Sequence, residues 1–314
     1  MKPAITVEGL TRKFGRLVAV DHLKFEVYPG EVFGFLGPNG AGKTTTVRML
    51  TGVIDPTEGT ATLQGHDIRK ASLLSRAHIA VVPEEANVYL DFTVWQNLML
   101  MAQLYGIDRH RRMRKADQLL DALDLKEKKK QKARALSKGL RQRLMLCAAL
   151  VTDPEILFLD EPTSGLDVQS ARLIRRIVAD LNRNGLTVFL TTHNMQEAGE
   201  MCSRVGIIEG GRIAAIDTPE KLRSTASFSQ YVDVRFSGAA PDHRDLLALA
   251  GVLKVDSEDC KFRLYTRTPG KVATDIVHLS DTKGMEIIHI STCKPSLEEV
   301  FLHFTGEGKE RDSR

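Results

Sequence analysis

A glycine-rich stretch at residues 37–45, GPNGAGKTT, carries the residues best suited to chemistry in this 314-residue chain. It matches G-x-x-x-x-G-K-[ST], follows the apolar segment VFGFL and precedes a helical segment. Glycines let such a loop turn its backbone N–H groups around a phosphate chain, while Lys43 reaches the terminal phosphates and the Thr44 hydroxyl can ligate Mg2+. The predicted nucleotide site comprises Gly37, Pro38, Asn39, Gly40, Ala41, Gly42, Lys43, Thr44 and Thr45.

Two acidic residues, Asp160 and Glu161, end the apolar run in ILFLDE. Ligands of α/β sheets gather at the carboxyl ends of strands, and two carboxylates there need a cation. We expect Asp160 to hold Mg2+, directly or through water, and Glu161 to polarise a water that attacks the terminal phosphate. An acidic pair at a strand end can also be merely solvated, but its combination with Lys43 and Thr44 favours the catalytic interpretation.

His193 follows another apolar run, TVFLTT. A histidine at a strand end is commonly a surface or capping residue. A third strand end of the same sheet would bring this one to the γ-phosphate, which an imidazole can sense by hydrogen bonding. We therefore predict that His193 is part of the catalytic site.

A second helix start lies in LSKGLRQRL at residues 136–144. Ser137 is a favourable cap, and helix starts already expose unpaired N–H groups and the positive end of the helix dipole. Lys138 and Arg141 add charge there, which indicates a nearby anion. The lysine-rich run at residues 126–132 is interpreted as a solvated helix.

Two kinds of strand must position these residues. AITVEGL and KFEVYPG alternate apolar and polar residues and predict antiparallel strands. EVFGFLG, IAVVP, EILFLD and LTVFLTTH are continuous apolar runs beside helical stretches, as in parallel strands buried on both faces. From Asp91 to about Ala149 the pattern is helical. We expect an α/β domain at residues 1–220, with an antiparallel β subdomain and an inserted helical subdomain at about 88–150.

A small second domain is predicted at residues 221–306. Its segments read strand, helix, strand, strand, helix, strand, which is the order of a ferredoxin-like α+β unit. Its last helix, SLEEVFLHF, has Ser296 and Glu299 at the spacing of a capping box. Residues 307–314 are interpreted as a polar tail.

The composition gives no indication of several classes of protein. A formal net charge of +4 is too small to indicate a nucleic-acid binder, and the four cysteines lack the CxxC spacing of a zinc site. No apolar run approaches the about 20 residues that cross a bilayer, and the start lacks the apolar stretch of a signal peptide. We expect a cytoplasmic protein that reaches a membrane only through another chain.

In the order GPNGAGKTT, LSKGLRQRL, ILFLDE, SGLD and TTH, the first 220 residues resemble the ATP-binding cassette (ABC) ATPases. Other P-loop families share the first and third motifs, whereas the LSxG signature before the acidic strand distinguishes this one. The resemblance implies a P-loop NTPase core of the RecA-like type that binds ATP with Mg2+ and hydrolyses it.

Further roles are implied by the same resemblance. Ser137 and Gly139 contact the γ-phosphate of an ATP held by a second copy, with Lys138 adding a charge there or pointing to solvent. Phe14 stacks on adenine, although a lone Phe near a strand is commonly a core residue. The loop that links the two sites across the dimer comprises Ser164, Gly165, Leu166 and Asp167.

Elementary physics supports such a homodimer. One chain offers two phosphate-seeking helix starts, and the first already surrounds a single triphosphate. A head-to-tail pair of chains satisfies both starts twice and buries two ATP molecules at a two-fold interface. Hydrolysis removes the γ-phosphate that favours the closed pair and so releases it.

The chain departs from the family pattern at two places. Glu84, in Pro83-Glu84-Glu85, stands where the family usually has a glutamine that touches Mg2+ and the attacking water. A carboxylate can still ligate the metal, but it adds negative charge near Glu161, so either metal coupling keeps this position active or hydrolysis is slower. LSKG replaces the commoner LSGG, and with the ending KPSLEEVFLHFTG it resembles ATPases of ABC-2 type exporters, including daunorubicin-resistance and sodium efflux systems.

The sequence therefore predicts the ATP-hydrolysing subunit of an exporter for a small apolar or amphipathic compound. Its partners would be a separate ABC-2 type membrane permease, docked near residues 87–95, and a second copy of itself, on the inner face of the cell membrane. A non-transport ABC ATPase acting on nucleic acid or ribosomes is the alternative, disfavoured by the single P-loop and the short span from Lys43 to Ser137. The second domain either senses a ligand or, as we prefer, contacts the dimer or the partner.

Overall fold

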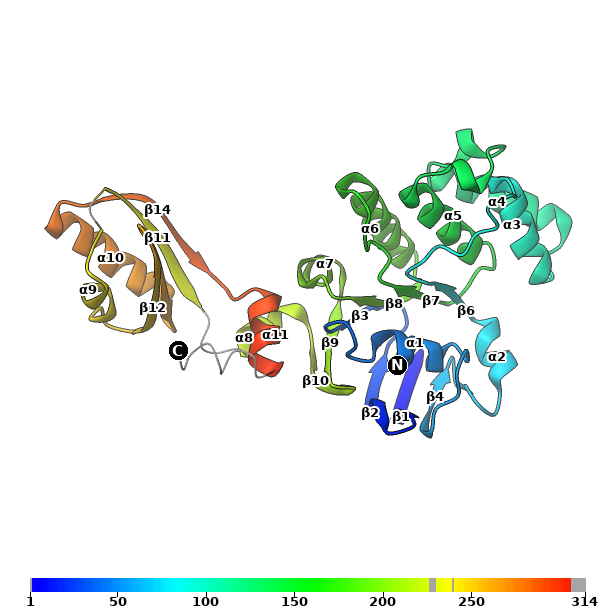
Figure 1. Cartoon of the computed structure of the whole chain (residues 1–314), viewed down its shortest axis with the longest axis horizontal. Helices are drawn as coiled ribbons and strands as arrows, with labels where there is room; N and C mark the ends of the chain where they lie inside the picture. The colour runs from blue at the N-terminus through cyan, green and yellow to red at the C-terminus, as the bar shows by residue number, and fades with distance from the viewer. Residues whose placement is uncertain (1, 226–229, 239, 306–314) are drawn as a thin grey trace. The chain divides into compact units, whose positions relative to one another are not determined.

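The computed structural model describes residues 2–225, 230–238 and 240–305. The chain divides into two compact units, Met1–Ile216 and Asp217–Arg314 (Figure 1). The polar tail predicted at residues 307–314 lies outside the described residues. Within the described part, none of the helices combines the length and the apolar character needed to cross a membrane.

An antiparallel sheet opens the first unit, as the alternating pattern predicts. Ile5 lies opposite Val27, and the strand pairs run antiparallel. The sheet has the order β2-β1-β4-β5. Its strands are β1 (Ile5–Phe14), β2 (Leu17–Val27), β4 (Glu58–Leu63) and β5 (His66–Asp67).

A six-stranded sheet, in the order β10-β9-β3-β8-β7-β6, forms the centre of this unit. The four strands predicted from continuous apolar runs are confirmed as parallel neighbours, and β3, β7 and β8 are buried along their whole length. The strands are β3 (Val32–Leu36), β6 (Ile79–Val82), β7 (Ile156–Asp160), β8 (Thr187–Thr192), β9 (Arg204–Glu209) and β10 (Arg212–Asp217).

Phenylalanines join the two sheets into one core. Phe25 on β2 stacks on Phe33 of β3 with ring centroids 5.5 Å apart, and Phe189 on β8 contacts both rings. Phe35 and Phe158 complete the cluster. Such aromatic pairs add stabilisation beyond the area they bury. The cluster therefore stabilises the strands whose ends carry the predicted site residues.

Helices flank and extend this core. The helical subdomain is confirmed, with Leu98, Leu120 and Leu144 buried between its helices. Figure 1 shows its three helices grouped together, and α5 packs beside β6. The helices of the unit are α1 (Lys43–Leu50), α2 (Ser72–Ala77), α3 (Val94–Leu104), α4 (Arg109–Ala122), η1 (Lys126–Lys128), η2 (Ala133–Ala135), α5 (Lys138–Leu150), α6 (Val168–Arg183) and α7 (Met195–Met201).

The second unit has the predicted ferredoxin-like order of elements. Its antiparallel sheet has the strand order β12-β13-β11-β14, which interleaves two split βαβ units. Val232, Phe236 and Ile276 are among its buried core residues. The elements are α8 (Pro219–Thr225), β11 (Tyr231–Ser237), α9 (His243–Leu247), β12 (Val252–Glu258), β13 (Lys261–Thr266), α10 (Pro269–Lys283), β14 (Glu286–Cys293) and α11 (Leu297–Thr305).

The capping box predicted at the last helix is also confirmed. The Ser296 backbone N–H donates to Glu299 Oε2 at 2.8 Å, and the Glu299 N–H donates to Ser296 Oγ at 3.1 Å. These two bonds satisfy two otherwise unpaired donors at the start of α11.

Candidate functional site

A cavity of about 220 Å³ lies where four neighbouring strands of the parallel sheet end. The phosphate loop (residues 37–45) follows β3, while Glu84, Glu161 and His193 follow β6, β7 and β8. Parallel strands bring their carboxyl ends to one edge, which explains why segments so distant in sequence meet there. The lining comprises Ala19, Pro38, Asn39, Gly40, Gly42, Lys43, Thr44, Thr45, Glu84, Glu161, Ser164 and His193.

The phosphate loop needs glycine at two points. Gly42 has a left-handed φ of 104°, and a Cβ there would lie 2.6 Å from the carbonyl oxygen of Ala19. At Gly37 a Cβ would lie 2.4 Å from the carbonyl oxygen of Ile208. Helix α1 starts directly after Gly42, without a side-chain cap. Its first backbone N–H groups are therefore free of capping side chains and suited to an anion.

Lys43 is a buried cation held by its own loop. Its side chain is 6% exposed, and Nζ donates to the carbonyl oxygens of Gly37 at 2.7 Å and Pro38 at 3.2 Å. Nζ also lies 3.2 Å from Glu161 Oε1. The ammonium group thus points at the cavity with its position fixed from two sides, as phosphate binding requires.

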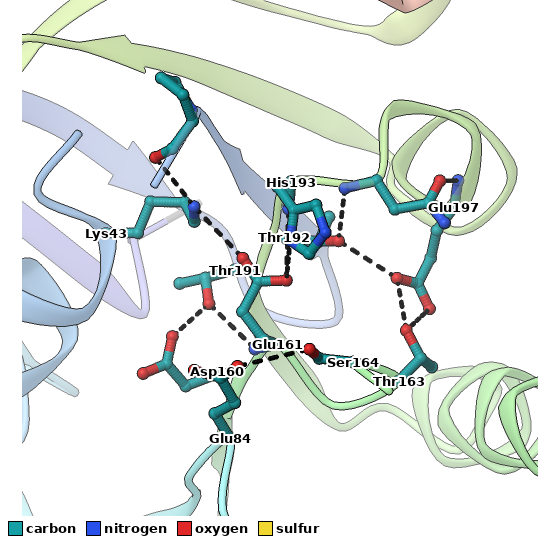
Figure 2. Close-up of polar contacts among 12 residues, drawn as sticks. Lys43, Glu84, Asp160, Glu161, Thr163, Ser164, Thr191, Thr192, His193 and Glu197 are labelled. Atoms are coloured by element: carbon teal, nitrogen blue, oxygen red, sulfur yellow. Dashed lines mark hydrogen bonds and ion pairs between the residues drawn. The ribbon is translucent and has the colours of Figure 1, made fainter. Parts of the chain in front are cut away.

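Glu161 is the buried carboxylate of the site (Figure 2). Its φ of 48° is left-handed, a conformation that costs a non-glycine residue about 1–3 kcal/mol and that clusters at functional sites. His193 Nδ1 lies 2.8 Å from Oε2, and the His193 backbone N–H donates to the same oxygen at 3.3 Å. Oε1 is buried, faces Lys43 and accepts no hydrogen bond. That oxygen is paired only with the Lys43 ammonium group, so a shift of Lys43 towards a bound phosphate would leave it able to accept a proton from water.

Asp160 is buried at the end of β7 and is not part of the cavity lining. The Thr191 hydroxyl donates to Asp160 Oδ1 at 2.5 Å. The Glu161 N–H donates to both the carbonyl oxygen and the hydroxyl of Thr191. Thr191 therefore orients the two acids relative to each other, a role that we did not predict although it lies in the TTH motif.

Glu84 also lines the cavity and is exposed. Ser164 donates to Glu84 Oε1 at 3.3 Å. This hydrogen bond links the loop after β6 to the loop after β7, so both carboxylates, Glu84 and Glu161, face the same small volume (Figure 2).

A third buried carboxylate, Glu197 on α7, hydrogen-bonds two threonines next to the site. Thr163 Oγ1 donates to it at 2.8 Å and Thr192 Oγ1 at 3.2 Å, and burial raises the pKa of its carboxyl group. These bonds tie the loop after β7 to the end of β8, next to Glu161 and His193 (Figure 2). In the sequence, Asn194-x-x-Glu197 indicates only a helix start, so this role was missed.

The predicted signature and linking-loop residues lie outside the cavity lining, apart from Ser164. Ser137 caps its own helix by accepting from the Leu140 N–H at 3.3 Å. Lys138 does not point freely to solvent, because its Nζ donates to the carbonyl oxygen of Ser164 in the same chain at 2.9 Å. A Cβ on Gly139 would lie 2.5 Å from Ser170 Oγ, so α5 and α6 begin in close contact.

Of the other predicted residues, Phe14, Gly37, Ala41 and Asp160 also lie outside the lining. Asp167 caps α6, and hydrogen bonds from Ser170 lower the pKa of its carboxyl group. Phe14 is 46% exposed rather than part of the core, and the guanidinium carbon of Arg12 lies 4.6 Å from its ring centroid. An exposed ring of this kind is available for stacking.

The donor set fits a magnesium nucleotide. The described residues contain no group of three or more His, Cys, Asp or Glu side chains arranged to hold a metal on its own. Mg2+ typically takes one or two protein oxygens and completes its shell with phosphate oxygens and waters. Thr44, Asp160 and Glu84 offer hard oxygen donors of that kind, and Glu161, whose Oε1 is paired with Lys43, lines the same cavity as Thr44 and Glu84.

Comparison with known proteins agrees with this geometry. Residues 20–164 match the family model described as ABC transporter. The chain is 36% identical to the Nod factor export ATP-binding protein I of Ralstonia nicotianae, with 97% of this chain and 94% of the relative covered. It is 34% identical to a daunorubicin resistance ATP-binding protein of Streptomyces coeruleorubidus, with 98% and 97% covered. A solved ATP binding subunit of an ABC transporter matches at 26% identity with a TM-score of 0.65, covering 71% of this chain and 92% of that one. The chain therefore belongs to the ABC transporter family, as one of its ATP-binding and ATP-hydrolysing subunits.

Proposed function

We propose that this ATPase powers the export of a small apolar or amphipathic compound through a separate ABC-2 type permease. The full-length similarity to ATP-binding proteins of export and resistance systems supports this proposal. The ATPase would sit on the inner face of the cell membrane and touch the membrane only through the permease. No contact with nucleic acid is part of the proposal.

The observation that carries the catalytic proposal is the buried Glu161, held between Lys43 and His193 at the mouth of the phosphate loop. Glu161 Oε1 would take the proton of the attacking water. His193 would hold Glu161 by donating from Nδ1, and with both ring nitrogens carrying a proton it would also donate from Nε2 to the γ-phosphate. Lys43 would bind the β- and γ-phosphates once they displace its loop carbonyl contacts.

Mg2+ would be held by Thr44 and Asp160, with Glu84 as a further oxygen donor. When bound, the ion neutralises charge on the transferred phosphoryl group. Asp160 can reach the ion through a water because Thr191 already occupies one of its oxygens. The hydrogen bond from Ser164 would keep Glu84 in place. The position of Glu84 would therefore depend on the loop after β7.

The active form would be a head-to-tail dimer. Ser137 is exposed at the start of α5, and neither it nor the buried Gly139 lines this chain's own cavity, so their phosphate ligand would come from a second copy. Phe14 would stack on adenine at the exposed edge of the same site. Asp167, at the start of α6, would lie between the two nucleotide sites.

The permease would dock beside the loop that follows Glu84. Tyr89, Leu90 and Phe92 are exposed there, at 52%, 47% and 39%. Three exposed apolar side chains within four residues are typical of a protein contact. Trp95 is only half-buried, with Lys129 Nζ 3.7 Å from its ring centroid, and belongs to the helical subdomain rather than to this patch.

Glu161→Gln tests the catalytic assignment. Loss of the general base should lower the hydrolysis rate about 100- to 10,000-fold while ATP affinity changes little, because Gln keeps the shape of the side chain. The variant should also accumulate as an ATP-dependent dimer in light scattering. Glu8→Gln, an exposed change on β1, is the matched control. A Glu161→Gln protein that hydrolyses ATP at the wild-type rate would overturn the assignment.

A further inference from the structure

Glu161, the proposed general base, lies in a strained backbone conformation. Its φ of 48° falls in the left-handed region, where a non-glycine residue stays only if the surrounding structure holds it. On the strand side, the Glu161 N–H donates to the carbonyl oxygen of Thr191 at 3.1 Å and to its hydroxyl at 3.2 Å. On the loop side, the Ser164 N–H donates to the Glu161 carbonyl oxygen at 3.1 Å, which closes a tight turn. The position of Glu161 therefore depends on what holds this turn in place.

The turn is held by the side chain of Glu197, on α7. Thr163, inside the turn, has its Oγ1 2.9 Å from Glu197 Oε1 and 2.8 Å from Oε2, and donates its hydroxyl proton to this carboxylate. Glu197 is only 1% exposed, so water does not compete for the contact. The hydrogen bond thus fixes the turn after Glu161 to α7 (Figure 2).

The same carboxylate fixes the loop that carries His193. Thr192 Oγ1 donates to Glu197 Oε2 at 3.2 Å and accepts from the Asn194 backbone N–H at 2.9 Å. Asn194 Oδ1 in turn accepts from the Glu197 N–H at 3.0 Å. The residues on both sides of His193 are therefore tied to Glu197, one by its carboxylate and one by its backbone.

The contact between Glu161 and His193 needs these two loops to stay together. His193 Nδ1 lies 2.8 Å from Glu161 Oε2, although the two residues follow different strands. An ionised carboxylate has only acceptor oxygens, so Glu197 can take a hydroxyl proton from each loop at once. Among the residues that the structure describes, none forms an ion pair with Glu197. A buried carboxylate without a cation costs stability, so the stability of the fold alone does not account for it.

We propose that Glu197 is a positioning residue for ATP hydrolysis. It holds the turn after Glu161 and the loop of His193 in one arrangement, so that the base stays beside both the histidine and the phosphate loop. Glu197 does not line the cavity and acts only through these neighbours. This inference rests on the proposed role of Glu161 as the base.

Glu197→Gln tests the proposal, because Gln keeps the shape of the side chain but replaces one acceptor oxygen by a donor. The maximal hydrolysis rate should fall about tenfold, since small displacements of a reacting group cost large factors in rate, while the KM for ATP should change less than about twofold. The thermal unfolding midpoint should move by less than about 3 °C, because the lost hydrogen bond is offset by the loss of a buried charge.

The matched control is Glu31→Gln, the same change at another buried carboxylate. Glu31 precedes β3, at the opposite end of that strand from the phosphate loop, and forms an ion pair with Arg204 at 3.2 Å. This control should keep the wild-type rate and lower the unfolding midpoint more than Glu197→Gln does. The proposal is overturned if Glu197→Gln hydrolyses ATP at the wild-type rate, or if its loss of rate comes with a larger fall in the midpoint than the control shows.

Thr163 provides a second test of the same contact. Thr163→Val removes the hydroxyl at nearly constant volume and should slow hydrolysis about threefold to tenfold, whereas Thr163→Ser keeps the hydroxyl and should retain the wild-type rate. Thr51→Val removes a buried hydroxyl at the far end of α1 and should also leave the rate unchanged. Equal rates for Thr163→Val and Thr163→Ser would overturn the proposal.

The double variant Glu161→Gln, Glu197→Gln separates this inference from the assignment of the base. It should be no more than about twofold slower than Glu161→Gln alone, because residues that act as a unit have non-additive effects. A further tenfold loss would overturn the positioning role and leave the base assignment intact. A wild-type rate for Glu161→Gln alone would overturn the base assignment, and the positioning role with it.

Discussion

Two helix starts of the first unit, those of α1 and α5, both resemble anion sites but are built differently. At α1, Gly42 is left-handed and provides no side-chain cap, and Lys43 is buried in the cavity wall. At α5, Ser137 caps its own helix, and both Ser137 and Lys138 are exposed outside the cavity. The first start leaves its N–H groups for a ligand, while the second satisfies one of its own.

The side chains around the starts of α1 and α5 also differ. The start of α1 faces Glu161 and His193, so one chain supplies the phosphate loop, the buried cation and the acid. The start of α5 faces no such group and packs instead against the start of α6 through Gly139 and Ser170. One start thus has its ligating groups in the same chain, whereas the other would be completed by a second molecule in the proposed dimer.

The largest effect is expected at the start of α1. Lys43→Met removes a charge-assisted contact worth about 1.5–3 kcal/mol, so the dissociation constant for Mg-ATP should rise about 10- to 100-fold and hydrolysis should become undetectable. Calorimetry and phosphate release measure the two effects.

Lys43→Met can weaken ATP binding in two ways, because it removes a phosphate contact and also leaves the buried Glu161 carboxylate without its cation. The control must separate these two effects. The double variant Lys43→Met, Glu161→Gln removes that cost, and its ATP affinity should still be weak relative to Glu161→Gln alone. Equal affinities of these two proteins would show that Lys43 does not contact phosphate.

A smaller effect is expected at the start of α5, and it should appear in the hydrolysis rate and in dimerisation rather than in ATP affinity. Gly139→Ala brings a Cβ to 2.5 Å from Ser170 Oγ and 2.8 Å from Ser170 Cβ, which must push the start of α5 away from α6. Hydrolysis and ATP-dependent dimerisation should fall about tenfold, whereas ATP affinity of the monomer should not change. Rate assays and light scattering distinguish this from a binding defect.

Gly270→Ala is the matched control for Gly139→Ala, because a Cβ there meets no atom within 4 Å. It should leave the rate unchanged. Adding Ser170→Gly to Gly139→Ala restores the space and should recover activity. A Gly139→Ala protein that binds ATP more weakly, without any loss of dimerisation, would mean that the second start acts in its own chain.

The site at the start of α1 was predictable because strand ends of a parallel sheet converge. Continuous apolar runs identified β3, β7 and β8 as buried parallel strands, and that inference alone brings the phosphate loop, Glu161 and His193 to one edge. The geometry that supports them was not predictable. Thr191 and Glu197 act through contacts between neighbouring loops, and neither spacing nor hydrophobic pattern carries information about which hydroxyl meets which carboxylate.

The surroundings of the start of α5 were harder to predict for a related reason. The helix start itself follows from the cap at Ser137, but the direction of Lys138 depends on a loop 26 residues away along the chain. A four-carbon side chain can reach solvent, a partner or a carbonyl oxygen equally well. The fold of the second unit followed from its element order, whereas the pairing of charged side chains across its sheet depends on strand register, which that order does not specify.

The smallest effect is expected at Lys138, which connects the start of α5 to the cavity beside the start of α1. Its Nζ donates to the Ser164 carbonyl oxygen, and the Ser164 hydroxyl donates to Glu84, so the second start contacts the wall of the first site. Exposed contacts of this kind are worth about 0–1 kcal/mol. Lys138→Met should therefore slow hydrolysis only about two- to threefold, with no dependence on salt, and Lys138→Arg should retain the wild-type rate. If Lys138 instead lay against the triphosphate of a second copy, Lys138→Met would cost a tenfold or larger factor that shrinks as salt is raised, because exposed charges are screened over about 10 Å at 0.1 M.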